Sequence, residues 1–158
     1  MIMTHEEIMQ LGVDRARKTM NKNIGGPFGA VITKGDEIIA VSSNQVLATH
    51  DPTAHAEVSA IRKACQVLGT HDLSGCAIYA SGSPCPMCMS AIIWANIKEV
   101  YVSGSVEDAE EIGFRDNYIY NFIKDDCNNR NIVRIHHLDR KPARMLYREY
   151  AQMQKQMY

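Results

Sequence analysis

The chain has 158 residues, of which 46% are hydrophobic, and its formal net charge is −1. This length suits one globular domain with a single core, and the composition excludes a disordered or fibrous protein. The near-neutral charge argues against nucleic acid as a partner, because proteins that grip a polyphosphate usually carry a large basic excess.

Local signals predict helices that alternate with strands. Thr4 and Glu7 have the spacing of a capping box, which predicts a helix start, and Gly69 suits a helix end. In chain order we expect a helix over 4–22, strands over 30–33 and 38–41, a helix over 53–68, a strand over 77–80, a helix over 85–95, a strand over 100–102, helical stretches over 106–112 and 116–125, a strand over 132–135, and a helix from 143 to the end. This order predicts a three-layer α/β/α sandwich with a mixed central sheet.

The N-terminus and the cysteines both indicate the cytoplasm. Residues 1–7 have neither a basic start nor an apolar run, so they do not resemble a signal peptide. No stretch has the length and apolarity of a membrane span. The five cysteines are an odd set, which is typical of reduced thiols inside the cell. We therefore expect a cytoplasmic protein with no membrane partner.

Two short segments carry the residues of a metal site: His55-Ala56-Glu57 and Pro84-Cys85-Pro86-Met87-Cys88. A catalytic zinc ion takes three protein ligands and leaves a fourth position for water. One imidazole and two thiolates meet this requirement, and the thiolates balance the metal's charge. Cys85 and Cys88 lie three residues apart at a predicted helix start, where the helix dipole favours the thiolate form. The pairing of H-x-E with P-C-x-x-C resembles the signature of zinc-dependent base deaminases.

Glu57 has a different predicted role from the three ligands. It lies two residues after His55, too close to be a comfortable fourth ligand on the same helical turn. Beside the open position it can take a proton from water that the metal activates. It can then return the proton to the nitrogen that leaves a ring carbon as ammonia. The sequence therefore predicts a hydrolytic deaminase.

Other uses of the C-x-x-C segment have to be weighed. Such a segment occurs in redox sites and in structural zinc sites. A structural site would need a fourth Cys or His and has no use for Glu57, so the complete set favours catalysis. A non-catalytic interaction module stabilised by zinc is the alternative from another functional class.

Over nearly the whole chain the sequence resembles the bacterial guanine deaminases, a branch of the cytidine-deaminase-like superfamily. The resemblance rests on residues 24–31, Asn44, 51–58, 84–88, 91–95, 113–116, 118–120 and Tyr158. It implies one zinc ion per subunit and the conversion of guanine to xanthine and ammonia. The zinc motif alone fits any branch, so deaminases of another aminopurine, a purine nucleoside, an aminotriazine or adenosine in tRNA stay as alternatives.

The resemblance also implies individual roles in binding and catalysis. Phe28 would stack on the purine, Asn44 would hydrogen-bond its ring, and the backbone at Ala54 would contact its carbonyl side. Asp116 would accept from the N–H edge of guanine and assist proton transfer. Tyr158 would close over the substrate.

The same residues also have ordinary structural interpretations. Asp116 suits a helix N-cap, Phe28 suits the core, and a chain terminus such as Tyr158 is often frayed. Two positions depart from the family pattern: Ser83 stands where the family usually has Glu, and Arg115 adjoins Asp116. If these positions influence the pocket, the preferred base differs from guanine.

The resemblance implies a homodimer as well. We expect one deaminase domain over residues 1–158, with residues 116–158 forming a C-terminal segment that is exchanged between the two subunits. The exchange would place Tyr158 in the active site of the partner. The expected small-molecule partner is a purine.

Overall fold

The computed structural model describes residues 2–158, which divide into two compact units, one ending at Tyr120 and one spanning Asn121–Tyr158. Most elements belong to the first unit: α1 (His5–Met20), β1 (Gly29–Lys34), β2 (Glu37–Ser43), α2 (Val46–Thr49), α3 (Ala56–Leu68), β3 (Cys76–Gly82), α4 (Pro86–Trp94), β4 (Glu99–Gly104) and α5 (Val106–Glu111). The boundary falls within α6 (Asp116–Lys124), and α7 (Lys141–Gln152) lies in the second unit. Among these helices none combines the length and apolarity of a membrane span.

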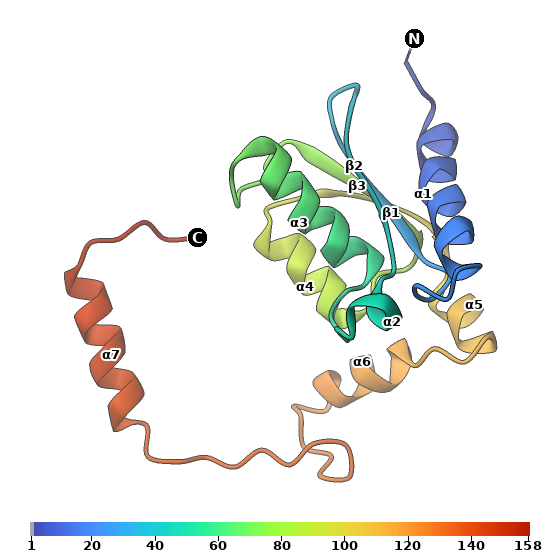
Figure 1. Ribbon diagram of the computed structural model, residues 1–158. Coiled ribbons are helices and arrows are strands. Elements are labelled where there is room, and N and C mark those ends of the chain that lie inside the picture. Colours follow the sequence, from blue (N-terminus) through green and yellow to red (C-terminus); the bar gives the residue numbers. More distant parts are fainter. Residues whose placement is uncertain (1) are drawn as a thin grey trace. The chain divides into compact units, whose positions relative to one another are not determined.

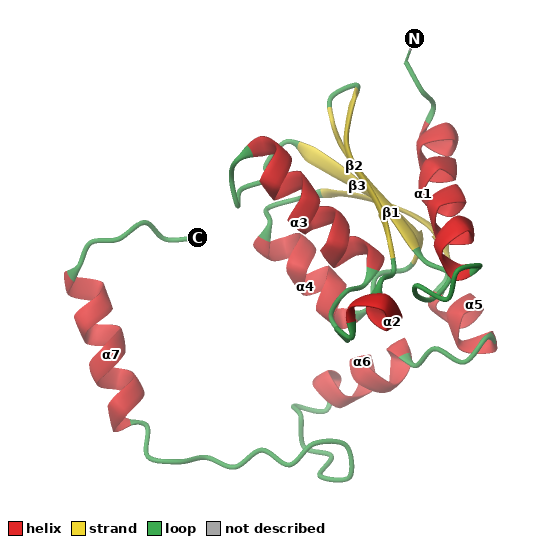
Figure 2. Ribbon diagram, in the orientation of Figure 1, coloured by secondary structure: helices red, strands yellow, loops and turns green. Residues whose placement is uncertain are grey.

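The sheet of the first unit has the strand order β2-β1-β3-β4 (Figure 2). β1 pairs antiparallel with β2 and β3, whereas β3 and β4 are parallel. The parallel pair needs a crossover, which α4 supplies. The sheet is therefore mixed, as predicted.

Helices cover both faces of this sheet. α1 lies on one face, and α3 and α4 lie side by side on the other (Figure 1). β1 is buried from Gly29 to Thr33 without alternation, as expected of a strand covered on both sides. The core between the sheet and α3 includes Ile32, Ile78 and Leu73. The predicted three-layer α/β/α sandwich is confirmed.

α1 begins and packs as its sequence dictates. Thr4 Oγ1 accepts from the Glu7 N–H at 3.1 Å, and Glu7 Oε2 accepts from the Thr4 N–H at 2.8 Å, so the predicted capping box is present. The helix then approaches β1 closely: a Cβ added to Gly29 would lie 1.9 Å from the Gly12 carbonyl oxygen. Only glycine at position 29 permits this contact.

Three predicted elements differ in the structure. The helix expected from 143 to the end of the chain runs over Lys141–Gln152 and does not reach Tyr158. The helix expected from Thr53 begins at Ala56, because Asp51 Oδ1 accepts from the Thr53 N–H at 2.9 Å and holds a turn before it. The strand expected over 132–135 is wrong, since this stretch has no regular structure. A strand needs a partner strand, and the described elements of Asn121–Tyr158 include none.

Candidate active site

Three metal-ligand side chains meet where α3 and α4 begin. His55 is the N-cap of α3, Cys85 is the N-cap of α4, and Cys88 lies in the first turn of α4. His55 Nδ1 lies 3.6 Å from Cys85 Sγ and 3.5 Å from Cys88 Sγ. A tetrahedral zinc ion with its usual bond lengths would hold nitrogen and sulfur about 3.5 Å apart. The spacing of these donor atoms therefore fits zinc.

The charges of this cluster also call for a cation. Hydrogen bonding to Cys88, followed by the contact with His55, lowers the pKa of the Cys85 thiol to about 4. The pKa of Cys88 is raised, because its thiol is hydrogen-bonded to the Cys85 sulfur and is buried. One thiol thus ionises at the expense of the other. A divalent ion favours the thiolate form of both, so the donor chemistry fits a zinc site.

Glu57 lies beside this cluster without belonging to it. It occupies the first turn of α3, and only 6% of its surface is exposed. Burial raises the pKa of its carboxyl group. A carboxyl group whose pKa lies closer to neutrality is better suited to accept and return a proton during turnover. The position and the burial of Glu57 therefore suit a proton carrier.

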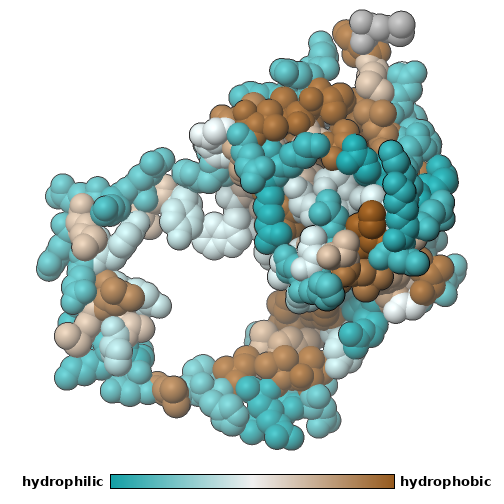
Figure 3. All heavy atoms as spheres, in the orientation of Figure 1, coloured by the Kyte–Doolittle hydropathy of each residue, from teal (hydrophilic) through white to brown (hydrophobic). Residues whose placement is uncertain are grey.

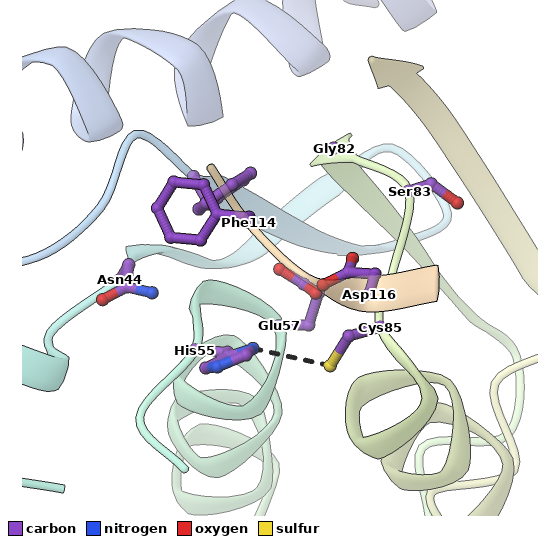
Figure 4. A pocket seen from close by; sticks show the side chains of 9 residues that line it. Asn44, His55, Glu57, Gly82, Ser83, Cys85, Phe114 and Asp116 are labelled. Carbon is purple, nitrogen blue, oxygen red and sulfur yellow. Dashed lines mark hydrogen bonds between the residues drawn. The ribbon is translucent and has the colours of Figure 1, made fainter. Parts of the chain in front are cut away.

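A pocket opens next to the ligands (Figure 4). Its empty space is about 390 Å³, a figure that includes open solvent at the mouth. In Figure 4 the carboxyl groups of Glu57 and Asp116 both point into this space. The lining residues are Phe28, Asn44, His55, Glu57, Gly82, Ser83, Cys85, Phe114 and Asp116.

Two polar side chains give the pocket walls opposite hydrogen-bonding character. Asn44 Oδ1 accepts from the Val46 N–H at 3.0 Å, which leaves its amide nitrogen as the group to donate. Asp116, the first residue of α6, presents an acceptor, and burial followed by the charge of Cys85 raises the pKa of its carboxyl group. The pocket therefore suits a ring with acceptors on one edge and donors on another.

Comparison with known proteins agrees with this arrangement. Residues 2–104 match the family model of the cytidine and deoxycytidylate deaminase zinc-binding region. The guanine deaminase of Bacillus subtilis (strain 168) is 49% identical over 130 residues, which cover 82% of this chain and 83% of that protein. The chain belongs to the guanine deaminase family. As a member of it, the chain is a zinc-dependent hydrolytic deaminase, so the predictions of family, reaction type and metal are confirmed.

Comparison with solved structures shows that this deaminase is similar to known deaminases in fold as well as in sequence. The B. subtilis guanine deaminase superposes with a TM-score of 0.93 and 41% identity over 99% of both chains. The Nitrosomonas europaea guanine deaminase gives a TM-score of 0.69 at 30% identity, covering 73% of this chain and 68% of that one. The tRNA-specific adenosine deaminase of Aquifex aeolicus is 39% identical, but over only 64% of this chain and 66% of that protein. The likeness to the tRNA enzyme thus spans less of the deaminase.

The structure brings most of the predicted site residues of this deaminase to one place. Phe28, Asn44 and Asp116 line the pocket, while Ala54 does not. Ala54 is buried, and both of its backbone groups are engaged: the N–H donates to the Asp51 carbonyl and the C=O accepts from the Gln45 N–H. Tyr158 lies in the second unit beside Leu146, Tyr147 and Tyr150. The roles proposed for these residues stay predictions.

Sequence reasoning did not assign a role to Phe114, which lines the pocket of this deaminase. Its ring meets that of Phe28 edge to face, with centroids 4.8 Å apart. Gly82 allows this arrangement, because a Cβ there would lie 3.1 Å from the Phe28 ring. The signals in the sequence were its aromatic ring directly after Gly113 and its place in the resemblance segment 113–116, and neither reveals which ring it will meet.

Proposed function

We propose that this deaminase converts guanine and water into xanthine and ammonia. The observation that carries the proposal is the carboxyl group of Asp116 in the pocket that is also lined by Glu57 and by two of the zinc ligands. Guanine donates hydrogen bonds from N1 and from the amino group on C2, so a carboxylate is a matching acceptor for this edge. Adenine presents an acceptor at N1 and would be repelled. The 49% identity to the B. subtilis enzyme supports the same substrate.

The chemistry divides between the metal and Glu57. Zinc held by His55, Cys85 and Cys88 would supply a Lewis acid that makes water nucleophilic at neutral pH. Glu57 takes one proton from the attacking water and passes it to ring N3 as the water oxygen bonds to C2. It then carries the hydroxyl proton to the amino nitrogen as the C2–N bond breaks. The products are xanthine and ammonia.

Other residues hold the ring in place for this transfer. The Asn44 amide donates to an acceptor atom of the purine. Phe28 and Phe114 provide apolar walls for the ring. The backbone around Ala54 contacts the carbonyl side of the base. Asp116 assists proton transfer from its position on the N–H edge.

We further propose a homodimer in which the predicted C-terminal segment is exchanged from Asn121 onward, since Asp116 and Tyr120 contact their own chain, and in which Tyr158 closes the site of the partner. No residue of α7 is buried. The side chains of Leu146, Tyr147 and Tyr150 gather with Tyr158, and Figure 3 shows a few hydrophobic residues among hydrophilic ones in this part of the chain. Apolar helix faces of this kind are covered by another surface in a working protein. A second subunit would provide that surface.

The same site supports a cytoplasmic location. All five cysteines are free thiols. Oxidation of Cys85 and Cys88 to a disulfide would remove two of the three metal ligands, so the enzyme needs a reducing compartment. We infer the cytoplasm on this ground.

Guanine is expected to be deaminated at least about 100-fold more efficiently, by kcat/KM, than any other base, because a wrong base leaves buried polar groups unpaired. The measurement is ammonia release by the zinc-loaded protein from guanine, guanosine, adenine, cytosine, ammeline and an adenosine-containing tRNA hairpin. Turnover concentrated on any other member would reject guanine and keep the zinc chemistry. Turnover of the hairpin would favour the activity named for the Aquifex aeolicus relative.

Replacement of Tyr158 by alanine is expected to lower kcat/KM about 10-fold or more, because an aromatic ring that covers the bound base is lost. Tyr158→Phe is the matched control and should retain most activity if the ring provides the closure. Zinc content and melting temperature should not change. Unaltered kinetic constants in Tyr158→Ala would reject the closing role.

Mixed dimers test the exchange itself. A dimer of one Glu57→Ala chain and one Tyr158→Ala chain regains one complete site only if the C-terminal segment crosses to the partner. Co-expression of the two chains with different tags isolates this dimer. If the mixed dimer has the KM of the unmodified protein, the exchange is supported. If it has the KM of the Tyr158→Ala protein, the exchange is contradicted.

A further inference from the structure

Tyr120 makes a contact that none of the roles above uses. Its hydroxyl donates to the Pro84 carbonyl at 2.9 Å. Pro84 is fully buried and immediately precedes the zinc ligand Cys85. The backbone donors nearby go elsewhere: the Cys88 N–H points to Cys85 Sγ, and the Ser83 N–H bonds the Gly104 carbonyl. The Tyr120 hydroxyl therefore supplies a donor to the loop that carries a metal ligand.

Tyr120 lies one helical turn after Asp116 on α6. Residues four apart share one face of a helix. That face thus presents the Asp116 carboxyl group to the pocket and the Tyr120 hydroxyl to the Pro84–Cys85 loop. Burial raises the pKa of Tyr120, so its hydroxyl stays protonated as a donor. The two side chains link the predicted base-binding residue to the metal loop.

Little else fixes the start of α6. None of the residues of this helix is buried. On the N-terminal side Gly113 has a φ of +102°, and the edge-to-face contact of Phe114 with Phe28 is the nearest anchor. Arg115 lies over the Tyr118 ring, a contact within the segment that gives no support from the core. Asp116 is therefore held between two contacts, Phe114 on one side and Tyr120 on the other.

We propose that Tyr120 is a positioning residue that sets the distance between the Asp116 carboxyl group and the metal loop by its hydrogen bond to Pro84. It does not touch the substrate. It keeps the Asp116 carboxyl group, which accepts from the N–H edge of the base, at a fixed distance from the ring carbon that water attacks. This inference rests on the role proposed above for Asp116.

The test is Tyr120→Phe in the zinc-loaded, full-length protein, which removes one hydroxyl and keeps the ring. KM for the deaminated base should rise about 3- to 10-fold, the value of one neutral hydrogen bond, with kcat within about twofold. Zinc content should not change, and the melting temperature should shift by no more than about 4 °C. Tyr118→Phe, two residues earlier and exposed, is the matched control and should leave both constants unchanged.

A double-mutant cycle links the effect to Asp116. In the Asp116→Asn background, Tyr120→Phe should change KM by less than about twofold, because the group it positions has gone. Unchanged KM in the single variant would overturn the proposal. So would a fall in kcat that follows loss of zinc, or additive effects in the cycle. The substrate is whichever base the unmodified protein deaminates, so failure of the guanine assignment is seen separately in the substrate panel.

Discussion

Replacement of Glu57 by glutamine is expected to lower kcat/KM by about 1,000-fold or more while zinc stays bound. Glutamine has nearly the same shape, so the buried site keeps its packing, but an amide does not carry a proton at neutral pH. General acid–base groups typically contribute about 100- to 10,000-fold to turnover. Glu57 lies beside the metal-ligand group of His55, Cys85 and Cys88 and is not a member of it.

Zinc analysis and steady-state kinetics on the same samples measure this effect. Cys88→Ala is the matched control for the metal, since it removes a ligand a short distance from Glu57 and should lose zinc and activity together. Glu57→Ala should behave like Glu57→Gln. Substantial activity in either Glu57 variant would refute the proton-carrier mechanism and revive the non-catalytic zinc module.

Replacement of Asp116 by asparagine is expected to lower kcat/KM for guanine about 100-fold. The carboxylate accepts from two donors on one edge of guanine, whereas asparagine turns one of its own donors toward that edge. Hydrogen bonds to charged groups contribute about 1.5 to 3 kcal/mol each, and an unpaired donor adds a further cost. The main change should be in KM if Asp116 only binds the base, and in kcat as well if it assists proton transfer.

Glu110→Gln is the control for this variant. Its carboxylate also acts on Asp116 through its charge, yet it does not line the pocket. Kinetic constants within about twofold of the unmodified protein are expected for it. Equal effects of Glu110→Gln and Asp116→Asn would mean that net charge near α6, and no hydrogen bond to the base, determines the activity.

The metal ligands could be predicted because their geometry is local. Cys85 and Cys88 lie three residues apart at the start of α4, which fixes the distance between their side chains. His55 lies at the start of α3, which packs beside α4. The sheet followed from equally local signals, such as the apolar runs of β1 and β3 and the turn between β1 and β2. These features depend on residues close in sequence, so the pattern alone contains them.

The parts that sequence failed to predict depend on distant partners. The apolar residues over 132–135 looked like a strand, but a strand forms only where another strand receives it. Phe114 lines the pocket because its ring packs against the ring of Phe28, a residue distant in sequence. The base-binding role of Asp116 was predicted through family resemblance, since no local pattern distinguishes such an aspartate from one at an ordinary helix start. Tertiary contacts decide these cases.

The order of functional residues along the chain has an evolutionary consequence. The metal ligands and Glu57 all lie between residues 55 and 88, within the region shared with the wider deaminase family, whereas Phe114 and Asp116 follow β4. The bond-breaking residues and the two pocket residues that follow β4 therefore occupy separate stretches of the chain, while Phe28 and Asn44 of the same pocket precede His55. A lineage can replace the stretch after β4 by recombination or insertion and acquire a new substrate without rebuilding the reaction centre.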